Sequence, residues 1–241
     1  MKQVYFYDEG DGKNKKLLGG KGAGLCEMTR LKLPVPPGFT ITTEVCKMYY
    51  TNNKKLPKTL IPEVKKNIAK IEKRTGKKWN SKENPLLVSV RSGAAISMPG
   101  MMDTILNLGL NDETVEGLAK KSNNARFAWD SYRRFVQLFG KVVFGVEDKK
   151  FDEVLENAKL NQAVQADSAL NEKSLKTVVS EYKKICEKHT GVKFPSDPSE
   201  QLELAIKAVF GSWMGERAVV YREKNNITKD IADGTAVNVV S

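Results

Sequence analysis

The order of β-like and helical runs constrains the fold of this 241-residue chain most strongly. Up to about residue 110, short β-like runs alternate with stretches of helical spacing. The β-like runs are 5–7, 38–42 and 86–91, and the helical stretches are 22–31, 43–51 and 60–74. From about 111 to 223 the pattern is helical almost throughout. The sequence therefore predicts an α+β protein into which a helical subdomain is inserted.

Three segments follow from this pattern. Residues 1–110 are predicted to form an α/β lobe, 111–230 a helical subdomain, and 231–241 the start of a further strand. Within the subdomain, aromatic residues at three- and four-residue spacing predict an amphipathic core helix over 125–144. Asp197-Pro198-Ser199-Glu200 supplies an N-cap and a proline at the first helical position, so a helix should start there and continue past Trp213.

The β-branched run at the C-terminus needs sheet neighbours for its backbone groups. We therefore expect the natural polypeptide to continue beyond Ser241. The alternative is a C-terminal strand that is paired inside this domain.

The chain is basic, with 40 Lys and Arg against 29 Asp and Glu and a formal charge of +11. Clustered cations of this kind can neutralise nucleic-acid phosphates. Here the lysine pairs are spread over the whole chain, without a nucleic-acid-binding motif or an aromatic platform between them. Solvated lysine faces are the preferred interpretation, and no nucleic-acid partner is expected.

Cysteines and apolar runs indicate the compartment. Cys26, Cys46 and Cys186 are far apart and odd in number, which predicts reduced, buried thiols and no metal site. The N-terminus has no signal-peptide run, and no stretch approaches the roughly 18 apolar residues of a membrane span. We expect a cytoplasmic protein without a membrane partner.

One β-like run ends on a cation and opens into a loop of small residues. The run 88–90 leads to Arg91, and Ser92-Gly93-Ala94-Ala95 follows. A strand that delivers a guanidinium into a loop with accessible backbone amides is suited to bind an anion, most often phosphate. This segment favours nucleotide or phosphate chemistry.

A second candidate phosphate loop lies near the N-terminus. Lys21 stands among four glycines at the start of a helical stretch, where backbone amides and the helix dipole favour an anion. The spacing is not that of a P-loop, because no Ser or Thr follows a Gly-Lys pair. A tight turn before a helix is the structural alternative, and the pairing with the Arg91 loop favours a polyphosphate ligand.

These segments resemble the N-terminal nucleotide-binding domain of the pyruvate, phosphate dikinase family. The resemblance is carried by Leu17–Met28, Pro34–Glu44, Val88–Leu110, Asp130–Phe135, Ala208–Trp213 and Gly234–Val239, and so extends over most of the chain. The run from Ser97 to Thr104 is its most specific part. Phosphoenolpyruvate synthases are similar at the Lys21 loop and at Arg91-Ser92 but differ in that run, so they rank second.

The resemblance implies an ATP-grasp-like fold, of which this chain would form the first lobe. It implies transfer of the β,γ-pyrophosphoryl group of ATP to a histidine on a separate central domain, with release of AMP. Inorganic phosphate and then pyruvate, in a barrel domain, would accept phosphoryl groups in later steps. The full-length enzyme would be a homodimer, and this chain alone is not expected to complete the cycle.

The resemblance also assigns site residues. Lys21 and Arg91 would bind the phosphates and stabilise the charge that shifts along the triphosphate. The loop lining the nucleotide site would comprise Gly100, Met101, Met102, Asp103 and Thr104. Thr104 would donate its hydroxyl to a phosphate oxygen, and Met102 or Ile105 would pack near the base. The Mg²⁺ ligands would lie mainly beyond residue 241.

Each role has a structural alternative. Arg91 could pair with a carboxylate, Asp103 could brace its loop instead of meeting magnesium, and the methionines could fill the core. Two positions depart from the family pattern: Ala95 stands in place of a second arginine, and Val240 in place of a glutamine. They leave open a non-catalytic binding or regulatory module of the same fold.

Overall fold

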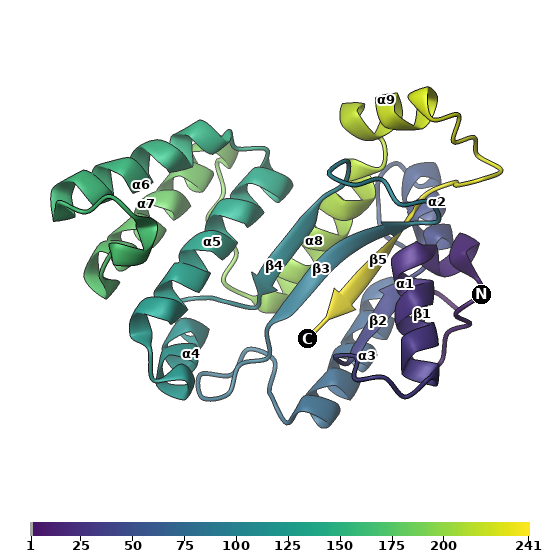
Figure 1. Ribbon diagram of the computed structural model, residues 1–241, viewed down its shortest axis with the longest axis horizontal. Helices are drawn as coiled ribbons and strands as arrows, with labels where there is room; N and C mark the ends of the chain where they lie inside the picture. Colours follow the sequence, from purple (N-terminus) through teal and green to yellow (C-terminus); the bar gives the residue numbers. More distant parts are fainter. Residues whose placement is uncertain (1) are drawn as a thin grey trace. The chain divides into compact units, whose positions relative to one another are not determined.

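The computed structural model describes residues 2–241 and divides them into two compact units (Figure 1). The sheet unit comprises 2–76, 88–104 and 203–241, and the helical unit comprises 77–87 and 105–202. The predicted α+β class is confirmed.

A five-stranded sheet has the order β1-β2-β5-β3-β4. The strands are β1 (Val4–Phe6), β2 (Gly38–Ile41), β3 (Val88–Ala94), β4 (Thr104–Leu108) and β5 (Thr235–Val240). The pairs β1–β2, β2–β5 and β3–β5 are antiparallel. The C-terminal strand β5 is therefore paired on both sides, with β2 and with β3. This confirms the alternative prediction of a C-terminal strand that is paired inside this domain.

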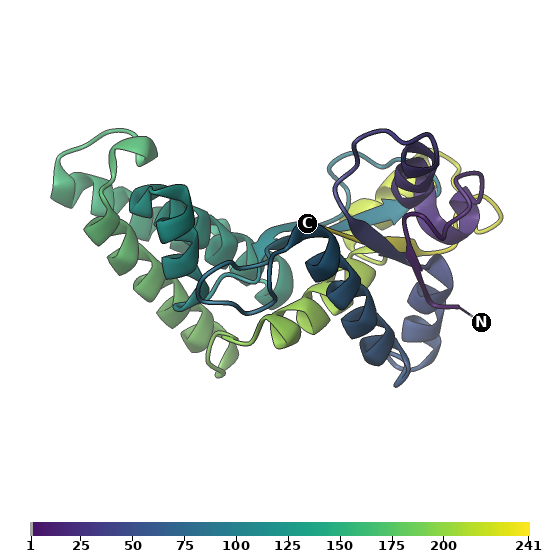
Figure 2. The same ribbon diagram turned by 90° about the horizontal axis from the view of Figure 1, so that it is seen from below.

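Helices α1 (Lys15–Arg30) and α3 (Leu60–Thr75) cover opposite faces of the sheet. The sheet unit also contains α2 (Thr43–Thr51), the C-terminal part of α8 (Pro198–Ser212) and α9 (Glu216–Lys224). Figure 2 shows α1, in purple, and α3, in dark blue, on opposite sides of the sheet. The Arg74 guanidinium of α3 stacks over Phe6, whereas α1 packs with Tyr7. Adjacent residues of a strand point to opposite faces, so each helix has its own face.

The helical unit contains α4 (Thr114–Ser122), α5 (Ala125–Phe144), α6 (Asp148–Gln162) and α7 (Glu172–Thr190), with the short 3₁₀ turn Asp167–Ala169 between α6 and α7. Its core is aromatic: Phe139 of α5 contacts Phe135, Phe144 and Phe194 at ring-centroid distances of 5.2–5.5 Å. The predicted amphipathic helix over 125–144 is confirmed by α5.

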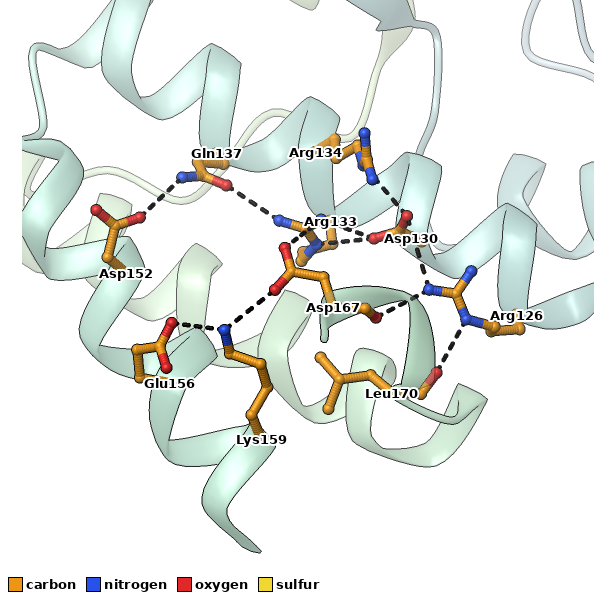
Figure 3. A network of polar contacts seen from close by, with 10 residues as sticks. All are labelled: Arg126, Asp130, Arg133, Arg134, Gln137, Asp152, Glu156, Lys159, Asp167 and Leu170. Carbon is orange, nitrogen blue, oxygen red and sulfur yellow. Dashed lines mark hydrogen bonds and ion pairs between the residues drawn. The ribbon is translucent and has the colours of Figure 1, made fainter. Parts of the chain in front are cut away.

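A polar network joins α5 to α6 and to the 3₁₀ turn (Figure 3). Arg133 is 4% exposed, with one guanidinium nitrogen 2.7 Å from Asp130 Oδ1 and 3.7 Å from Asp167 Oδ2. Asp130 also accepts a hydrogen bond from Arg134, which is 65% exposed. The buried cation is thus neutralised by two carboxylates, as a buried charge requires.

Two expected boundaries differ from the structure. The predicted lobe 1–110 includes two segments that belong to the helical unit, 77–87 and 105–110. The predicted subdomain 111–230 includes one segment that belongs to the sheet unit, 203–230. The helix that begins after Asp197 ends at Ser212 and does not continue past Trp213. There the Trp213 N–H donates to the Phe210 carbonyl in a turn. Helical spacing cannot reveal which core a helix joins.

Candidate functional site

The two loops predicted to bind phosphate lie together in the sheet unit, on a pocket of about 490 Å³. This volume is within the range of small-molecule sites. The lining residues come from the start of α1, the end of β3 and the loop that follows it: Gly20, Lys21, Ser92, Gly93, Ala94, Ile96, Ser97, Met98, Pro99, Gly100, Met102 and Thr104.

The start of α1 is shaped by a kink at Gly19. This residue has φ 68° and ψ 165°, so the regular part of the helix begins at Gly20. The first N–H groups of a helix lack intrahelical partners and carry the positive end of its dipole. Because Gly20 and Lys21 line the pocket, this helix end is presented to whatever occupies it.

Lys21 adds a full positive charge at the same place. Partial burial of its ammonium group, together with the nearby Arg91 guanidinium, lowers the pKa of Lys21 below its usual value of 10.5. Both effects disfavour the charged form. An anion in the pocket would offset both effects.

The loop from Ser97 to Asp103 forms the opposite wall. The Met101 N–H donates to the Met98 carbonyl at 3.2 Å, and Gly100 adopts φ 73°. Proline followed by glycine with positive φ is favoured at the two central positions of a type II turn. Met98 is 7% exposed and anchors the turn.

Arg217 of α9 also contacts this wall. Its guanidinium donates to the Gly100 carbonyl at 3.3 Å and lies 3.7 Å from Asp103 Oδ1. Arg217 was not predicted from the sequence, because nothing in its surroundings distinguishes it from other surface arginines of a helix. Asp103 thus takes part in bracing its loop.

The structure brings some of the predicted site residues to the pocket and leaves others away from it. Those that line it are Lys21, Gly100, Met102 and Thr104. Met101 and Asp103 belong to the same loop without lining the pocket. Arg91 is exposed on β3, close enough to Lys21 to affect its pKa. Ile105 is fully buried, so it presents no surface to a base here.

The two departures from the family pattern lie outside this pocket. Ala95 lines a separate pocket with residues that include Glu44 and Asp233. Val240 packs against the apolar cluster of Tyr7, Leu18, Ala23 and Cys26. Neither side chain contributes a polar group to the Lys21 pocket.

Residues 2–241 contain neither a metal-binding cluster nor a membrane-spanning helix. No three His, Cys, Asp or Glu side chains of this region are grouped so that they could hold a metal ion. No helix of this region is long and apolar enough to cross a membrane. Lys21 is the charged side chain among the residues that line the pocket, and an ammonium group suits the phosphate end of a nucleotide.

Comparisons with known proteins show the family of the chain. The family model "Pyruvate phosphate dikinase, AMP/ATP-binding domain" matches residues 15–60 and 53–241. Pyruvate, phosphate dikinase of Entamoeba histolytica is 59% identical over 241 residues, which is 100% of this chain and 27% of that protein. The Clostridium symbiosum enzyme is 48% identical over 99% of this chain and 27% of its own length. The chloroplastic pyruvate, phosphate dikinase of Flaveria pringlei is 53% identical over 96% of this chain and 24% of its own length. The chain spans about a quarter of these relatives.

Proposed function

Because the chain belongs to the pyruvate phosphate dikinase AMP/ATP-binding domain family, we propose that it binds the triphosphate of ATP in the Lys21 pocket. It would act there as the first lobe of an ATP-grasp-like site. The observation that carries the proposal is the meeting of the α1 N-terminus, the Lys21 ammonium group and the 97–104 loop around one pocket. Such a combination of amides, helix dipole and cation is suited to phosphate groups.

The proposed contribution to catalysis is electrostatic. Lys21 and Arg91 would neutralise the charge that moves along the triphosphate as the β,γ-pyrophosphoryl group passes to a histidine outside this chain and AMP leaves. Gly100, Met101, Met102, Asp103 and Thr104 would form the wall next to the nucleotide, with the Thr104 hydroxyl donating to a phosphate oxygen. Met102 would pack near the base.

The remaining parts of the reaction are assigned to other segments. Mg²⁺, which would neutralise phosphate charge, would be held by carboxylates outside this chain. The phosphohistidine domain, the pyruvate-binding barrel and a second subunit would complete a cytoplasmic enzyme that converts ATP, phosphate and pyruvate to AMP, pyrophosphate and phosphoenolpyruvate. This chain alone would bind ATP without turnover.

The test is calorimetric titration of the 241-residue chain with ATP in the presence of Mg²⁺. Lys21→Ala and Arg91→Ala should each weaken binding by about tenfold to a hundredfold, since a charge-assisted hydrogen bond contributes about 1.5–3 kcal/mol. Lys65→Ala removes the same charge from the exposed face of α3 and should leave binding unchanged. Equal affinity in all four proteins would refute the proposed site.

A further inference from the structure

Asn238 occupies the middle of the sheet face that α1 covers. In the strand register it stands opposite Thr40 of β2 and opposite Arg91 of β3. Residues directly opposite each other point to the same face. The Asn238 side chain is fully buried, and its Oδ1 accepts a hydrogen bond of 2.9 Å from the Thr40 hydroxyl. Asn238 is therefore a cross-strand neighbour of one of the two site cations.

Two glycines leave the space that this side chain fills. A Cβ atom on Gly22 would lie 2.9 Å from Asn238 Oδ1, and one on Gly93 would lie 2.7 Å from Asn238 Nδ2. Gly22 follows Lys21 directly, and Gly93 is two residues from Arg91. The amide of Asn238 thus lies between the helix that carries one cation and the strand that carries the other.

The same amide has an unpaired donor. Asn238 Nδ2 is buried and has no hydrogen-bond partner among residues 2–241. An unpaired buried polar group costs about 1–3 kcal/mol. The amide keeps this unpaired donor while its oxygen serves the buried Thr40 hydroxyl, and the donor points into the contact with Gly93.

We propose that Asn238 is a positioning residue for triphosphate binding, which holds the Lys21 end of α1 and the Arg91 end of β3 at a fixed separation. The proposal rests on the proposed function, because it takes Lys21 and Arg91 as phosphate ligands. Its physical basis is contact: the planar amide is rigid, is fixed by Thr40, and touches the backbone of both elements through their glycines. A small displacement between two ligating groups is enough to lose much of their joint effect.

The test compares Asn238→Ala with Asn67→Ala in the whole chain. Asn67 of α3 is a matched control, because it is also buried in the sheet unit and also has one unpaired amide atom, Oδ1. Two quantities are measured well below each unfolding midpoint: the dissociation constant for ATP with Mg²⁺, and the pKa of Lys21 without ATP, followed by NMR of the lysine side chains.

Asn238→Ala should weaken ATP binding by about tenfold and move the pKa of Lys21 up toward 10.5, since Lys21 then moves away from Arg91 and the pocket wall. Asn67→Ala should change neither quantity, although it also lowers the unfolding midpoint. Unchanged affinity and unchanged Lys21 pKa in Asn238→Ala would overturn the proposal.

Asn238→Leu keeps the size of the side chain but removes the planar amide and the acceptor for Thr40, so it tests the proposal if the alanine variant does not fold. It adds no charge, so a shifted Lys21 pKa and weaker ATP binding would report a changed separation, and no change in either would refute the role. The Lys21 pKa also separates the two hypotheses. If the wild-type chain binds no ATP, the proposed function fails, while a shifted Lys21 pKa in the variants still supports the positioning contact.

Discussion

Gly19 packs so closely on the Gly93 carbonyl that a Cβ atom at position 19 would lie 1.8 Å from its oxygen. Gly19 also has φ 68°, a conformation that side chains with a Cβ rarely adopt. Gly19 starts the kink before Lys21, and Gly93 follows Arg91 along β3. The backbones of the two proposed phosphate-binding segments are thus in direct contact, without side chains between them.

Gly19→Ala should therefore be among the most damaging single substitutions in the sheet unit. We expect a loss of about 3 kcal/mol or more of unfolding free energy in urea, from steric overlap added to backbone strain. Gly24→Ala is the control on the same helix, because a Cβ there meets nothing within 4 Å. Gly24→Ala should be neutral or stabilise by up to about 1 kcal/mol. Similar stability losses in both variants would contradict this packing.

The contact between Arg217 and the pocket loop predicts a separate effect on binding. Arg217→Ala removes a hydrogen bond to the Gly100 carbonyl and the ion pair with Asp103. Arg217 is 67% exposed, so stability should change by less than about 1 kcal/mol. A less ordered loop should weaken ATP binding by a few fold in fluorescence titration, whereas Arg30→Ala, on the exposed end of α1, should not. Arg217 has no role in the site if the two variants bind ATP equally.

Glu9 predicts part of the acid sensitivity. Desolvation raises its pKa, but hydrogen bonds from Lys70, Lys2 and the Phe6 N–H outweigh that effect and bring it down from 4.5 to about 2. A lowered carboxyl pKa stabilises the fold above pH 4.5, and this stability is lost as the pH falls toward 2. Glu9→Gln should remove about 1 kcal/mol at pH 7, after allowance for solvent screening, and nothing near pH 2.

This prediction is measured by urea unfolding from pH 2 to pH 7. Lys70→Met provides the complementary variant, because it leaves Glu9 in place and removes one of its donors. It should raise the pKa of Glu9 and shift the acid transition to higher pH. Parallel stability curves for wild type and Glu9→Gln would contradict the assignment.

The buried ion pair of the helical unit should matter far more than its exposed neighbour. Asp130→Ala leaves the Arg133 cation buried with weaker compensation and should cost about 3–5 kcal/mol. Arg134→Ala removes another partner of the same carboxylate, but Arg134 is 65% exposed, so the cost should be below about 1 kcal/mol. Asp130→Asn with Arg133→Met should recover part of the loss. Equal costs for Asp130→Ala and Arg134→Ala, measured by urea unfolding, would contradict the network in Figure 3.

Local patterns predicted the elements of this fold better than their assembly. The amphipathic spacing of 125–144 and of 43–51 predicted α5 and α2 with their observed bounds. The unit boundaries were not predicted, because segments 77–87 and 203–230 join their cores through contacts with residues distant in the sequence. The pairing of β5 between β2 and β3 depends on equally long-range contacts.

The site shows the same division. Glycines around Lys21 and small residues after Arg91 predicted two phosphate loops, because these residue types have a local backbone role, and the two segments line one pocket. The contacts of Arg217 and Asn238 with these segments were not predicted, since each contacts residues more than 100 positions away. Thr104 and Ile105 are adjacent on β4, so their side chains point to opposite faces of the strand. The sequence does not say which of the two faces is buried, and the structure shows that Ile105 is fully buried.

The most direct test of the central claim is the rate at which an amine-reactive reagent labels Lys21 in the whole chain, with and without ATP and Mg²⁺. Peptide mass spectrometry separates Lys21 from exposed lysines such as Lys65. The account predicts that ATP strongly slows labelling of Lys21, that adenosine without phosphates does not, and that Lys65 reacts equally in all three conditions. Labelling of Lys21 at the same rate with and without saturating ATP would contradict the claim that this pocket binds the triphosphate.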